Sequence, residues 1–527
     1  MNNLKYSIIP KPQRYDTVDA TFIVTPDTQV LCVADFVDAG KYLTDYLKTK
    51  TDASNGSIKF NKDSSIPSEG YTLKIDENGV VIAASDANGA FYGAVTLKIM
   101  LMQSKTADGK AVLNGADIYD YPRFSYRGGM LDDSRHFFGV ELVKKMLDNM
   151  ALVKLNKFHW HLSDDQGYRI ESDVYPLLNE IGSKRKFEHL EAKNLPLSMI
   201  CKNEGGEYFY YYTKDEIRDI VAYAKKLHID VIPEIDIPGH TSCMIAAYPE
   251  LVCNSVGCEV VSESGIMKNV LCPGKDSTYE FVENLLSEVI ELFPYEYFHI
   301  GGDEAGLGHK IWEKDCPDCK KLMQEKGVKT GNELQSVFMN RITDFLKSKG
   351  KTPIAWSDGI TDITNEGIAC HYWTLKNPLW VKKESKKRKF ILSPSTHFYF
   401  DMNFGYLPLK KTYNFNEAKL GISDINTVMG VEFETWSEWI TDKDTLEFSV
   451  FPRIYALAEV AWTKDKYKNY KDFYKRLDFF KLYMKSQNIN FSRVEKKKLG
   501  VKNVTCYHLG VKGNEYKYNE KLKKTEK

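Results

Sequence analysis

Several features that would assign this chain of 527 residues to other protein classes are scarce or absent. No apolar run approaches the ~20 residues that a membrane-spanning helix needs, and no apolar signal-peptide core follows Met1. Lys and Arg together number 72, as do Asp and Glu, so the formal net charge is zero and no nucleic-acid-binding surface is indicated. We therefore expect neither a membrane nor a nucleic-acid partner, and a chain that is either cytoplasmic or the mature form of an exported protein.

Cysteines and cofactor-binding motifs are sparse as well. The 10 Cys are too few to form a disulfide framework in a chain of this length. Cys316 and Cys319 have the spacing of half a zinc site, but no second close pair accompanies them, so two loop thiols or a local disulfide is the favoured interpretation. Gly301 and Gly302 are too short a run for a phosphate-binding loop, and no Ser or Cys lies in a nucleophile elbow. We expect no cofactor and no bound metal.

The length suits one large α/β barrel together with a smaller domain. Residues 1–120 form an α+β pattern, in which residues 71–75 and 80–84 alternate around Asn78 and Gly79 as in a β-hairpin. A helix over residues 90–102 follows. The sequence around Pro122 then marks a boundary, so we expect a small non-catalytic domain that ends near residue 120.

Short apolar strands alternate with amphipathic helices from Ser125 onward. The expected strand cores are residues 126–131, 157–162, 230–235, 297–300, 353–356, 368–373, 390–392 and 428–433. Thr213 with Glu216, and Ser277 with Glu280, have the spacing of capping boxes at helix starts. The pattern predicts a (β/α)8 barrel over residues 121–465, with a doubly wound sheet as the competing fold. Residues 466–527 are expected to form a helical segment and a Lys-rich tail.

Polar and aromatic residues follow almost every predicted strand, among them Asp303 and Glu304 after the fourth. In a (β/α)8 barrel the carboxyl ends of the strands form the active face. Burial of so many charges without a function would cost several kcal/mol for each ion. Carboxylates serve as general acids and bases, and indoles offer flat faces to sugar rings. The pattern therefore favours an enzyme that acts on carbohydrate.

Histidines on these strands leave a metal-dependent hydrolase open as an alternative. His159 and His161 alternate on one strand and so face the same way, and His240, His299 and His371 follow later strands. The excess of carboxylates fits a sugar site better. Hydrogen-bonded histidines at the barrel rim are the favoured interpretation.

The sequence resembles glycoside hydrolase family 20, the β-N-acetylhexosaminidases, over about residues 5–465. The run His-Ile-Gly-Gly-Asp-Glu at residues 299–304 is close to the catalytic signature of that family. The other matching blocks, in order, are residues 127–136, 159–165, 236–240, 356, 372–373, 399–401 and 436–438. The resemblance implies an exo-acting, retaining enzyme that removes terminal β-linked N-acetylglucosamine or N-acetylgalactosamine from oligosaccharides or glycoconjugates.

The resemblance also implies a substrate-assisted mechanism, because adjacent carboxylates cannot flank a glycosidic bond from opposite sides. The acetamido oxygen of the substrate attacks the anomeric carbon and forms an oxazolinium intermediate. Glu304 is then the general acid and base, with a raised pKa. Asp303 stays ionised and accepts a hydrogen bond from the acetamido N–H, while Tyr399 donates to the acetamido oxygen.

Further roles follow from the resemblance alone. Arg127 binds the outer hydroxyls of the terminal sugar, and Asp401 and Glu438 accept hydrogen bonds from hydroxyls at C4 and C6. Asp164 and His240 support Glu304. The indoles that enclose the acetamido methyl group and the sugar face are Trp356, Trp373 and Trp436. The residues expected to be mainly structural are Asp132, Asp133, Arg135 and His299, whereas Asp236 and Asp358 are balanced between packing and support of the site.

Three points stay open. A lacto-N-biosidase that releases a disaccharide, and a non-catalytic sugar-binding protein, are the remaining alternatives. The segment 402–416 is short and has no Trp, and Tyr406 and Tyr413 are the open candidates for an aromatic that many family members carry there. In an exported chain, the resemblance makes Cys253 and Cys272 the candidate disulfide.

Overall fold

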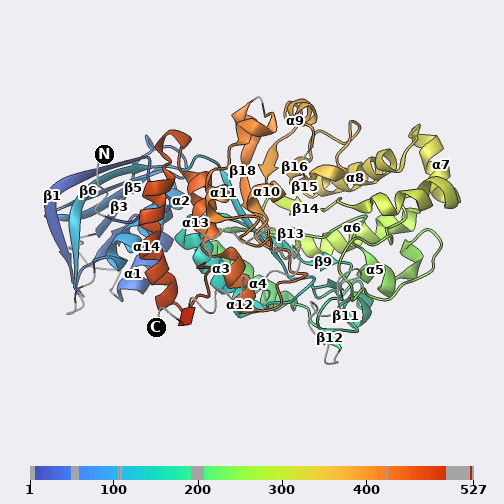
Figure 1. The fold of residues 1–527 in the computed structure, drawn as a ribbon, viewed down its shortest axis with the longest axis horizontal. Coiled ribbons are helices and arrows are strands. Elements are labelled where there is room, and N and C mark those ends of the chain that lie inside the picture. Colours follow the sequence, from blue (N-terminus) through green and yellow to red (C-terminus); the bar gives the residue numbers. More distant parts are fainter. Residues whose placement is uncertain are drawn as a thin grey trace.

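The computed structural model describes residues 6–25, 27–48, 58–104, 106, 110–191, 207–374, 376–422, 424–493 and 523–524. None of the helices in these ranges has the length and apolar character that a bilayer span requires. An N-terminal sheet lies at one end of the molecule and a barrel at the other (Figure 1).

The N-terminal unit is a six-stranded sheet in the order β1-β6-β4-β5-β3-β2. Its strands are β1 (Arg14–Val24), β2 (Val30–Cys32), β3 (Ile58–Lys62), β4 (Tyr71–Asp76), β5 (Gly79–Ala84) and β6 (Ala111–Asp120). The predicted hairpin is confirmed, because β4 and β5 pair antiparallel with Asp76 opposite Gly79. Helix α2 (Ala87–Met102) packs on this sheet and against α1 (Val37–Leu47).

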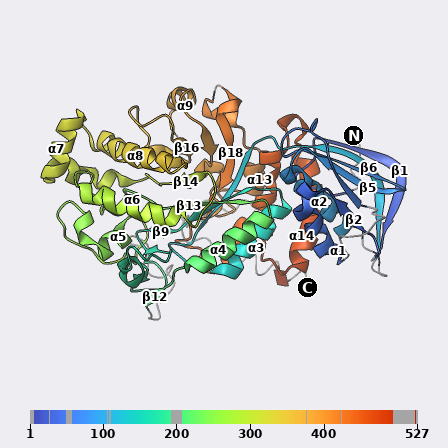
Figure 2. The ribbon, with the colours of Figure 1, turned by 180° about the vertical axis from the view of Figure 1, so that it is seen from behind.

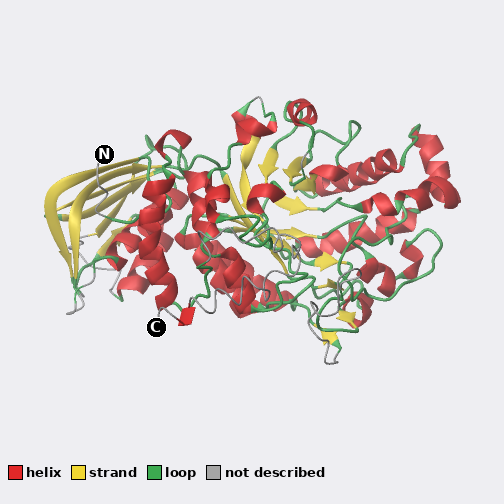
Figure 3. Ribbon diagram, in the orientation of Figure 1, coloured by secondary structure: helices red, strands yellow, loops and turns green. Residues whose placement is uncertain are grey.

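Eight parallel strands close into the barrel, which confirms the predicted fold and excludes the doubly wound sheet. They are β7 (Tyr126–Asp132), β8 (Lys157–His161), β13 (Asp230–Glu234), β14 (Tyr297–His299), β15 (Thr352–Trp356), β16 (Ala369–Tyr372), β17 (Phe390–Leu392) and β18 (Val428–Phe433). Each falls on a predicted strand core. Strand β18 pairs with β7 to complete the ring, and Figure 3 shows the strands enclosed by helices.

The outer helices include α3 (Val140–Leu152), α4 (Lys214–Lys226), α6 (Asp276–Ile290), α8 (Gly331–Ser348) and α13 (Arg453–Trp462). Thr213 forms the predicted capping box with Glu216 at the start of α4. The predicted box at Ser277 is wrong. Helix α6 begins one residue earlier, at Asp276, so Ser277 already lies inside the first turn, and Lys275 at the N-cap makes no side-chain cap.

Helix α14 (Tyr470–Ser486) lies between the N-terminal sheet and the barrel in both views (Figure 1, Figure 2). Arg476 on α14 pairs with Glu459 of α13 at 2.7 Å and donates to the backbone oxygen of Ile8. The helix thus holds both units together. Apart from residues 523–524, the predicted tail beyond residue 493 lies outside the described residues.

Candidate active site

The carboxylate pair follows a tight turn at the end of β14. Gly301 and Gly302 have φ values of +61° and +91°, which a side chain would strain. A Cβ at Gly301 would also come within 1.7 Å of the Asp236 carboxylate. That carboxylate accepts the Gly302 N–H at 3.1 Å, so Asp236 fixes the turn that presents Asp303 and Glu304.

Asp303 and Glu304 open into a cavity of about 380 Å³ at the carboxyl end of the barrel. Most of the predicted site residues meet there. The cavity is lined by Arg135, His240, Gly265, Ile266, Asp303, Glu304, Trp373, Ser395, Tyr399, Asp401, Met402, Trp436 and Glu438. These residues come from separate strand ends, which explains why no single segment of the sequence contains the site.

His240 links the carboxylate pair to Asp164. Its Nε2 lies 3.7 Å from Asp303 Oδ2 and 3.5 Å from Glu304 Oε2, while its Nδ1 lies 3.1 Å from Asp164 Oδ1. Burial opposes a charge on His240, but Asp164 and Asp303 outweigh it and raise the His240 pKa well above its usual range. His240 therefore stands beside both carboxylates, and its support of Glu304 stays a prediction.

Several carboxylates of the cavity have raised pKa values. Burial raises the pKa of Asp303 to about 7, although His240 opposes the shift. Burial and the neighbouring Glu438 raise the pKa of Asp401 to about 8. The ionised role predicted for Asp303 stays a prediction, since burial opposes its charge and His240 favours it.

Asp358 connects Glu304 to the aromatic wall. One carboxylate oxygen accepts the Glu304 backbone N–H at 2.9 Å, and the other accepts the Trp373 indole N–H at 2.8 Å. Glu304 has a φ of +50°, a conformation that non-glycine residues rarely adopt, and the bond from its N–H helps to hold it there. Asp358 and Asp236 thus both position the carboxylate pair, a role that the sequence left undecided.

Aromatic rings form one wall of the cavity. The rings of Trp373 and Tyr399 stack with centroids 6.0 Å apart, and Trp436 lies 6.3 Å from Tyr399. Trp356 is fully buried one layer below, 5.7 Å from Trp436, and its indole N–H donates to Glu234. Because Trp356 does not line the cavity, its contact with a sugar stays a prediction.

The predicted role of Arg127 is wrong. Arg127 is the second residue of β7 and so lies at the amino end of the barrel, opposite the active face. Its fully buried guanidinium binds both carboxylate oxygens of Glu69 at 3.0 Å and the hydroxyl of Tyr92 at 2.8 Å. Arg127 therefore joins the barrel to the N-terminal unit and does not reach the cavity.

Arg135 is the arginine that lines the cavity. Its Nη2 lies 2.7 Å from Asp164, its Nη1 lies 3.2 Å from Asp132, and its Nε donates to Gln166 at 3.0 Å. The guanidinium also lies over the ring of Trp436, 5.1 Å from its centroid. The network expected at the rim exists, but it also orients this cation toward the cavity. The sequence indicates this position for Arg135, since Arg135 follows the carboxyl end of β7.

The other strand histidines form a buried network beneath the cavity floor. His159 lies 2.8 Å from Glu432 and 3.1 Å from Glu234. Some of these side chains lie close enough to hold a metal ion, for example His159, Glu234 and His299. Burial opposes protonation of His159, yet the two carboxylates raise its pKa to about 10. The carboxylate partners on both sides of His159 favour hydrogen-bonded histidines over metal ligands.

Neither candidate for the additional aromatic lines the cavity. Tyr413 is buried and donates to Glu459 at 3.0 Å, beside α14. Tyr406 is also absent from the lining, where Met402 represents this segment instead. Neither Tyr406 nor Tyr413 therefore supplies an aromatic ring to this cavity.

Comparison with protein families gives two matches. A model described as glycosyl hydrolase family 20, catalytic domain, matches residues 124–465, and one described as glycosyl hydrolase family 20, domain 2, matches residues 5–121. The chain belongs to glycosyl hydrolase family 20. It is therefore a glycoside hydrolase, in agreement with the carboxylates and aromatic rings of its cavity.

Curated relatives include the β-hexosaminidase of Porphyromonas gingivalis, 33% identical in an alignment of 517 residues that covers 92% of this chain and 64% of that relative. The chain thus spans less than two thirds of that relative. The β-hexosaminidase of Vibrio furnissii is 31% identical over 86% of this chain and 76% of the relative. A solved exo-β-N-acetylglucosaminidase from Vibrio harveyi, in complex with N-acetylglucosamine, has a TM-score of 0.82 at 29% identity and covers 94% of this chain and 79% of that one.

Proposed function

We propose that this chain is an exo-acting, retaining β-N-acetylhexosaminidase that removes terminal β-linked N-acetylglucosamine or N-acetylgalactosamine through an oxazolinium intermediate. The observation that carries the proposal is the position of Asp303 and Glu304, which are adjacent in sequence and line the same cavity. Two such carboxylates suit a substrate that supplies its own nucleophile. The β-hexosaminidases among the relatives support the same reaction.

In the first step, the carbonyl oxygen of the acetamido group attacks the anomeric carbon while Glu304 gives its proton to the departing glycosidic oxygen. The glycosidic bond breaks, and the acetamido nitrogen gains positive charge. Asp303 accepts a hydrogen bond from the acetamido N–H and stabilises this charge in its ionised form. The growing positive charge favours that form over the neutral one, which offsets the effect of burial on the Asp303 pKa.

In the second step, Glu304 takes a proton from water as the water oxygen attacks the anomeric carbon. The oxazolinium ring opens, and two displacements on the same carbon give net retention. The Glu304 side chain is 30% exposed, whereas that of Asp303 is 11% exposed. This difference supports Glu304 as the residue that meets the leaving group and the water. Tyr399, in the aromatic wall, donates to the acetamido oxygen and directs its attack.

The charged end of the cavity binds the outer hydroxyls of the sugar. Arg135 takes over the donor role that was expected of Arg127, while Asp401 and Glu438 accept hydrogen bonds. Burial raises the pKa of Glu438, and Arg135 opposes that shift, so these groups compensate each other. Three such groups in the lining of one cavity of about 380 Å³ favour recognition of one terminal sugar over release of a disaccharide.

Glu304→Gln tests the proposal, with Glu77→Gln on the exposed hairpin turn as the matched control. With an aryl β-N-acetylglucosaminide, we expect the rate to fall about 10²- to 10⁴-fold in Glu304→Gln, the usual contribution of general acid–base catalysis, and to stay unchanged in the control. A thiazoline mimic of the intermediate should bind the wild-type chain tightly. Full activity of Glu304→Gln, an inverted product by NMR, or release of a disaccharide would each contradict the proposal.

A further inference from the structure

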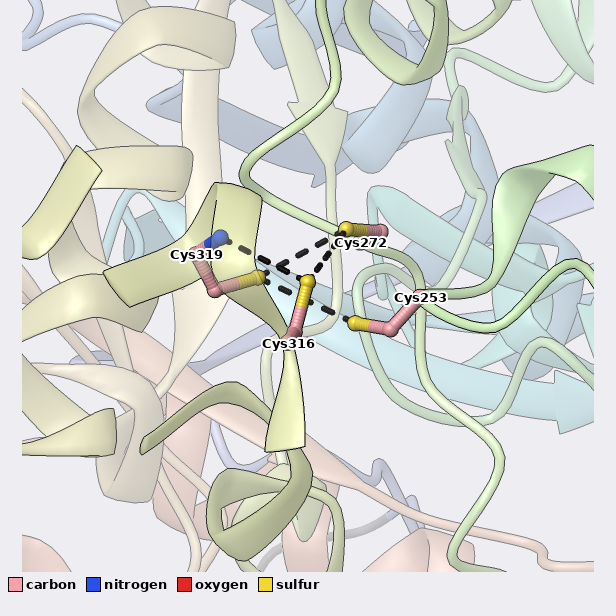
Figure 4. A group of neighbouring side chains, drawn as sticks. All are labelled: Cys253, Cys272, Cys316 and Cys319. Atoms are coloured by element: carbon pink, nitrogen blue, oxygen red, sulfur yellow. Dashed lines mark hydrogen bonds between the residues drawn. The ribbon is translucent and has the colours of Figure 1, made fainter. Parts of the chain in front are cut away.

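Four cysteines from two separate segments of the chain meet beside the barrel (Figure 4). They are Cys253, Cys272, Cys316 and Cys319, and their Sγ atoms all lie within 4.8 Å of one another. All four are free thiols, so the disulfide considered for Cys253 and Cys272 is not formed in this structure. The second pair that Cys316 and Cys319 lacked in the sequence is therefore supplied by the fold.

The spacing of the sulfur atoms matches that of a metal–thiolate tetrahedron. Cys272 Sγ lies 3.5 Å from Cys319 Sγ and 3.8 Å from Cys316 Sγ, and Cys253 Sγ lies 3.8 Å from Cys319 Sγ. Zinc binds thiolate sulfur at about 2.3 Å, which places the corners of a tetrahedron about 3.8 Å apart. An iron–sulfur cluster has several iron atoms between its ligands, so its cysteine sulfurs lie farther apart than these.

Backbone N–H groups point at two of the sulfurs. Cys316 is the N-cap of α7 (Pro317–Lys326), and its Sγ accepts the Cys319 N–H at 3.5 Å. The Gly274 N–H bonds to Cys272 in the same way. Such bonds favour the thiolate form and orient metal ligands. A Cβ at Gly274 would come within 2.4 Å of the Cys319 backbone nitrogen, so glycine allows the two turns to approach this closely.

An apolar shell encloses the four sulfurs. It consists of Val270, Ala305, Trp312, Met323 and Leu334, with Cys272, Cys316 and Cys319 themselves almost fully buried. Thiolates in such a shell need a cation to balance their charge. The residues of this shell carry no cationic side chain, so a bound metal ion is the natural counter-charge.

We propose that Cys253, Cys272, Cys316 and Cys319 bind one Zn²⁺ ion in a closed, tetrahedral structural site. Four protein ligands leave no coordination position for water or substrate, so the ion takes no part in the chemistry of the cavity. The inference does not depend on the proposed function.

The site would fasten two segments that shape the cavity. The loop that carries Cys253 and Cys272 also carries Gly265 and Ile266 of the cavity wall. The segment that carries Cys316 begins with Ala305, directly after Glu304. These segments already touch at Gly308 of one and Val270 of the other. They lie so close there that a Cβ at Gly308 would come within 2.2 Å of the Val270 side chain. Zinc would hold the cavity wall against the segment that follows the carboxylate pair.

Metal analysis of the purified full chain tests the proposal. We expect about one zinc per chain in the wild type, release of that zinc by a thiol-modifying mercurial, and a lower Tm after release. Cys316→Ser and Cys272→Ser should lose most of the zinc. Cys258→Ser is the matched control, since Cys258 lies in the same loop but binds the backbone oxygen of Ser242, and it should keep its zinc.

A second measurement serves if the serine variants fail to fold. Refolding of the wild type with Co²⁺ in place of zinc should give the absorption of a tetrahedral cobalt–thiolate centre. The proposal would be overturned if wild-type protein prepared with zinc and reductant contained no zinc, or contained iron in place of zinc. It would also be overturned by two disulfides in the mass spectrum, or by four cysteine thiols that react freely in the native chain.

Discussion

The reassignment of the sugar-binding arginine from Arg127 to Arg135 can be tested by one pair of matched substitutions, Arg135→Lys and Arg127→Lys. Lysine keeps the positive charge but loses the planar fork of N–H donors. In Arg135, three N–H-bearing nitrogens are held by Asp164, Asp132 and Gln166, which fixes the guanidinium at the cavity. A lysine cannot keep these contacts and also reach a sugar hydroxyl.

The size of the effect follows from the bonds that are lost. One hydrogen bond from a charged donor is worth about 1.5–3 kcal/mol, which corresponds to a fall of about 10- to 150-fold in kcat/KM. Arg127→Lys loses instead several bonds from a charged donor to Glu69, Tyr92 and the backbone oxygen of Phe124, at about 1.5–3 kcal/mol each. Its Tm should fall, with kcat/KM within about twofold of the wild type at a temperature where it is folded.

Steady-state kinetics with an aryl β-N-acetylglucosaminide and thermal unfolding of both variants give the answer. A loss of kcat/KM in Arg127→Lys at unchanged Tm, together with near-normal kinetics in Arg135→Lys, would refute the assignment. A fall of kcat/KM in Arg135→Lys that is matched by general unfolding would refute it as well, since the effect would then be structural.

Two further predictions concern the carboxylates that surround the reaction. The raised pKa of Asp303 means that its proton stabilises the folded chain fully below the ordinary Asp pKa of ~3.9, and that this stabilisation is lost as the pH rises through about 7. Asp303→Asn should therefore raise Tm at pH 8 but not at pH 4. The same substitution should lower kcat by about 10²- to 10³-fold. A lower Tm of the variant at pH 8 would contradict the raised pKa of Asp303. Asp358→Ala removes the acceptor of the Glu304 N–H and the Trp373 indole N–H, so its kcat should fall about 10²-fold. Asp358→Asn should recover part of that loss. Equal kcat in Asp358→Ala and the wild type would argue against a positioning role for Asp358.

The strands of the barrel were predictable because they are short apolar segments that are buried on both faces. All eight strand cores lie where the sequence placed them, for example Phe390–Leu392. Helix starts were less certain, since a capping pattern does not fix the first helical residue: Thr213 caps its helix and Ser277 does not. The carboxylate pair was predictable too, because it directly follows a strand and the carboxyl ends of all barrel strands meet on one face.

Position along a strand, more than residue type, separates the arginine that lines the cavity from the one that does not. Arg127 and Arg135 both belong to the block that resembles the family, but β7 begins at Tyr126 and ends at Asp132. Arg127 therefore lies at the amino end, against Glu69, and Arg135 lies at the carboxyl end, in the cavity. Stricter use of the same barrel rule would have chosen Arg135.

The sequence by itself determined the order of the strands and helices, the family, and the presence of Asp303 and Glu304 at a strand end. These are local properties, set by the hydrophobic pattern and by short motifs. Only the tertiary structure decided that Arg127 faces another domain, that Trp356 lies below the cavity, and that Cys253 and Cys272 meet the pair at Cys316 and Cys319. The physical reason is that these contacts join segments tens of residues apart, and the spacing of residues along a chain does not give their distance once the loops have folded back.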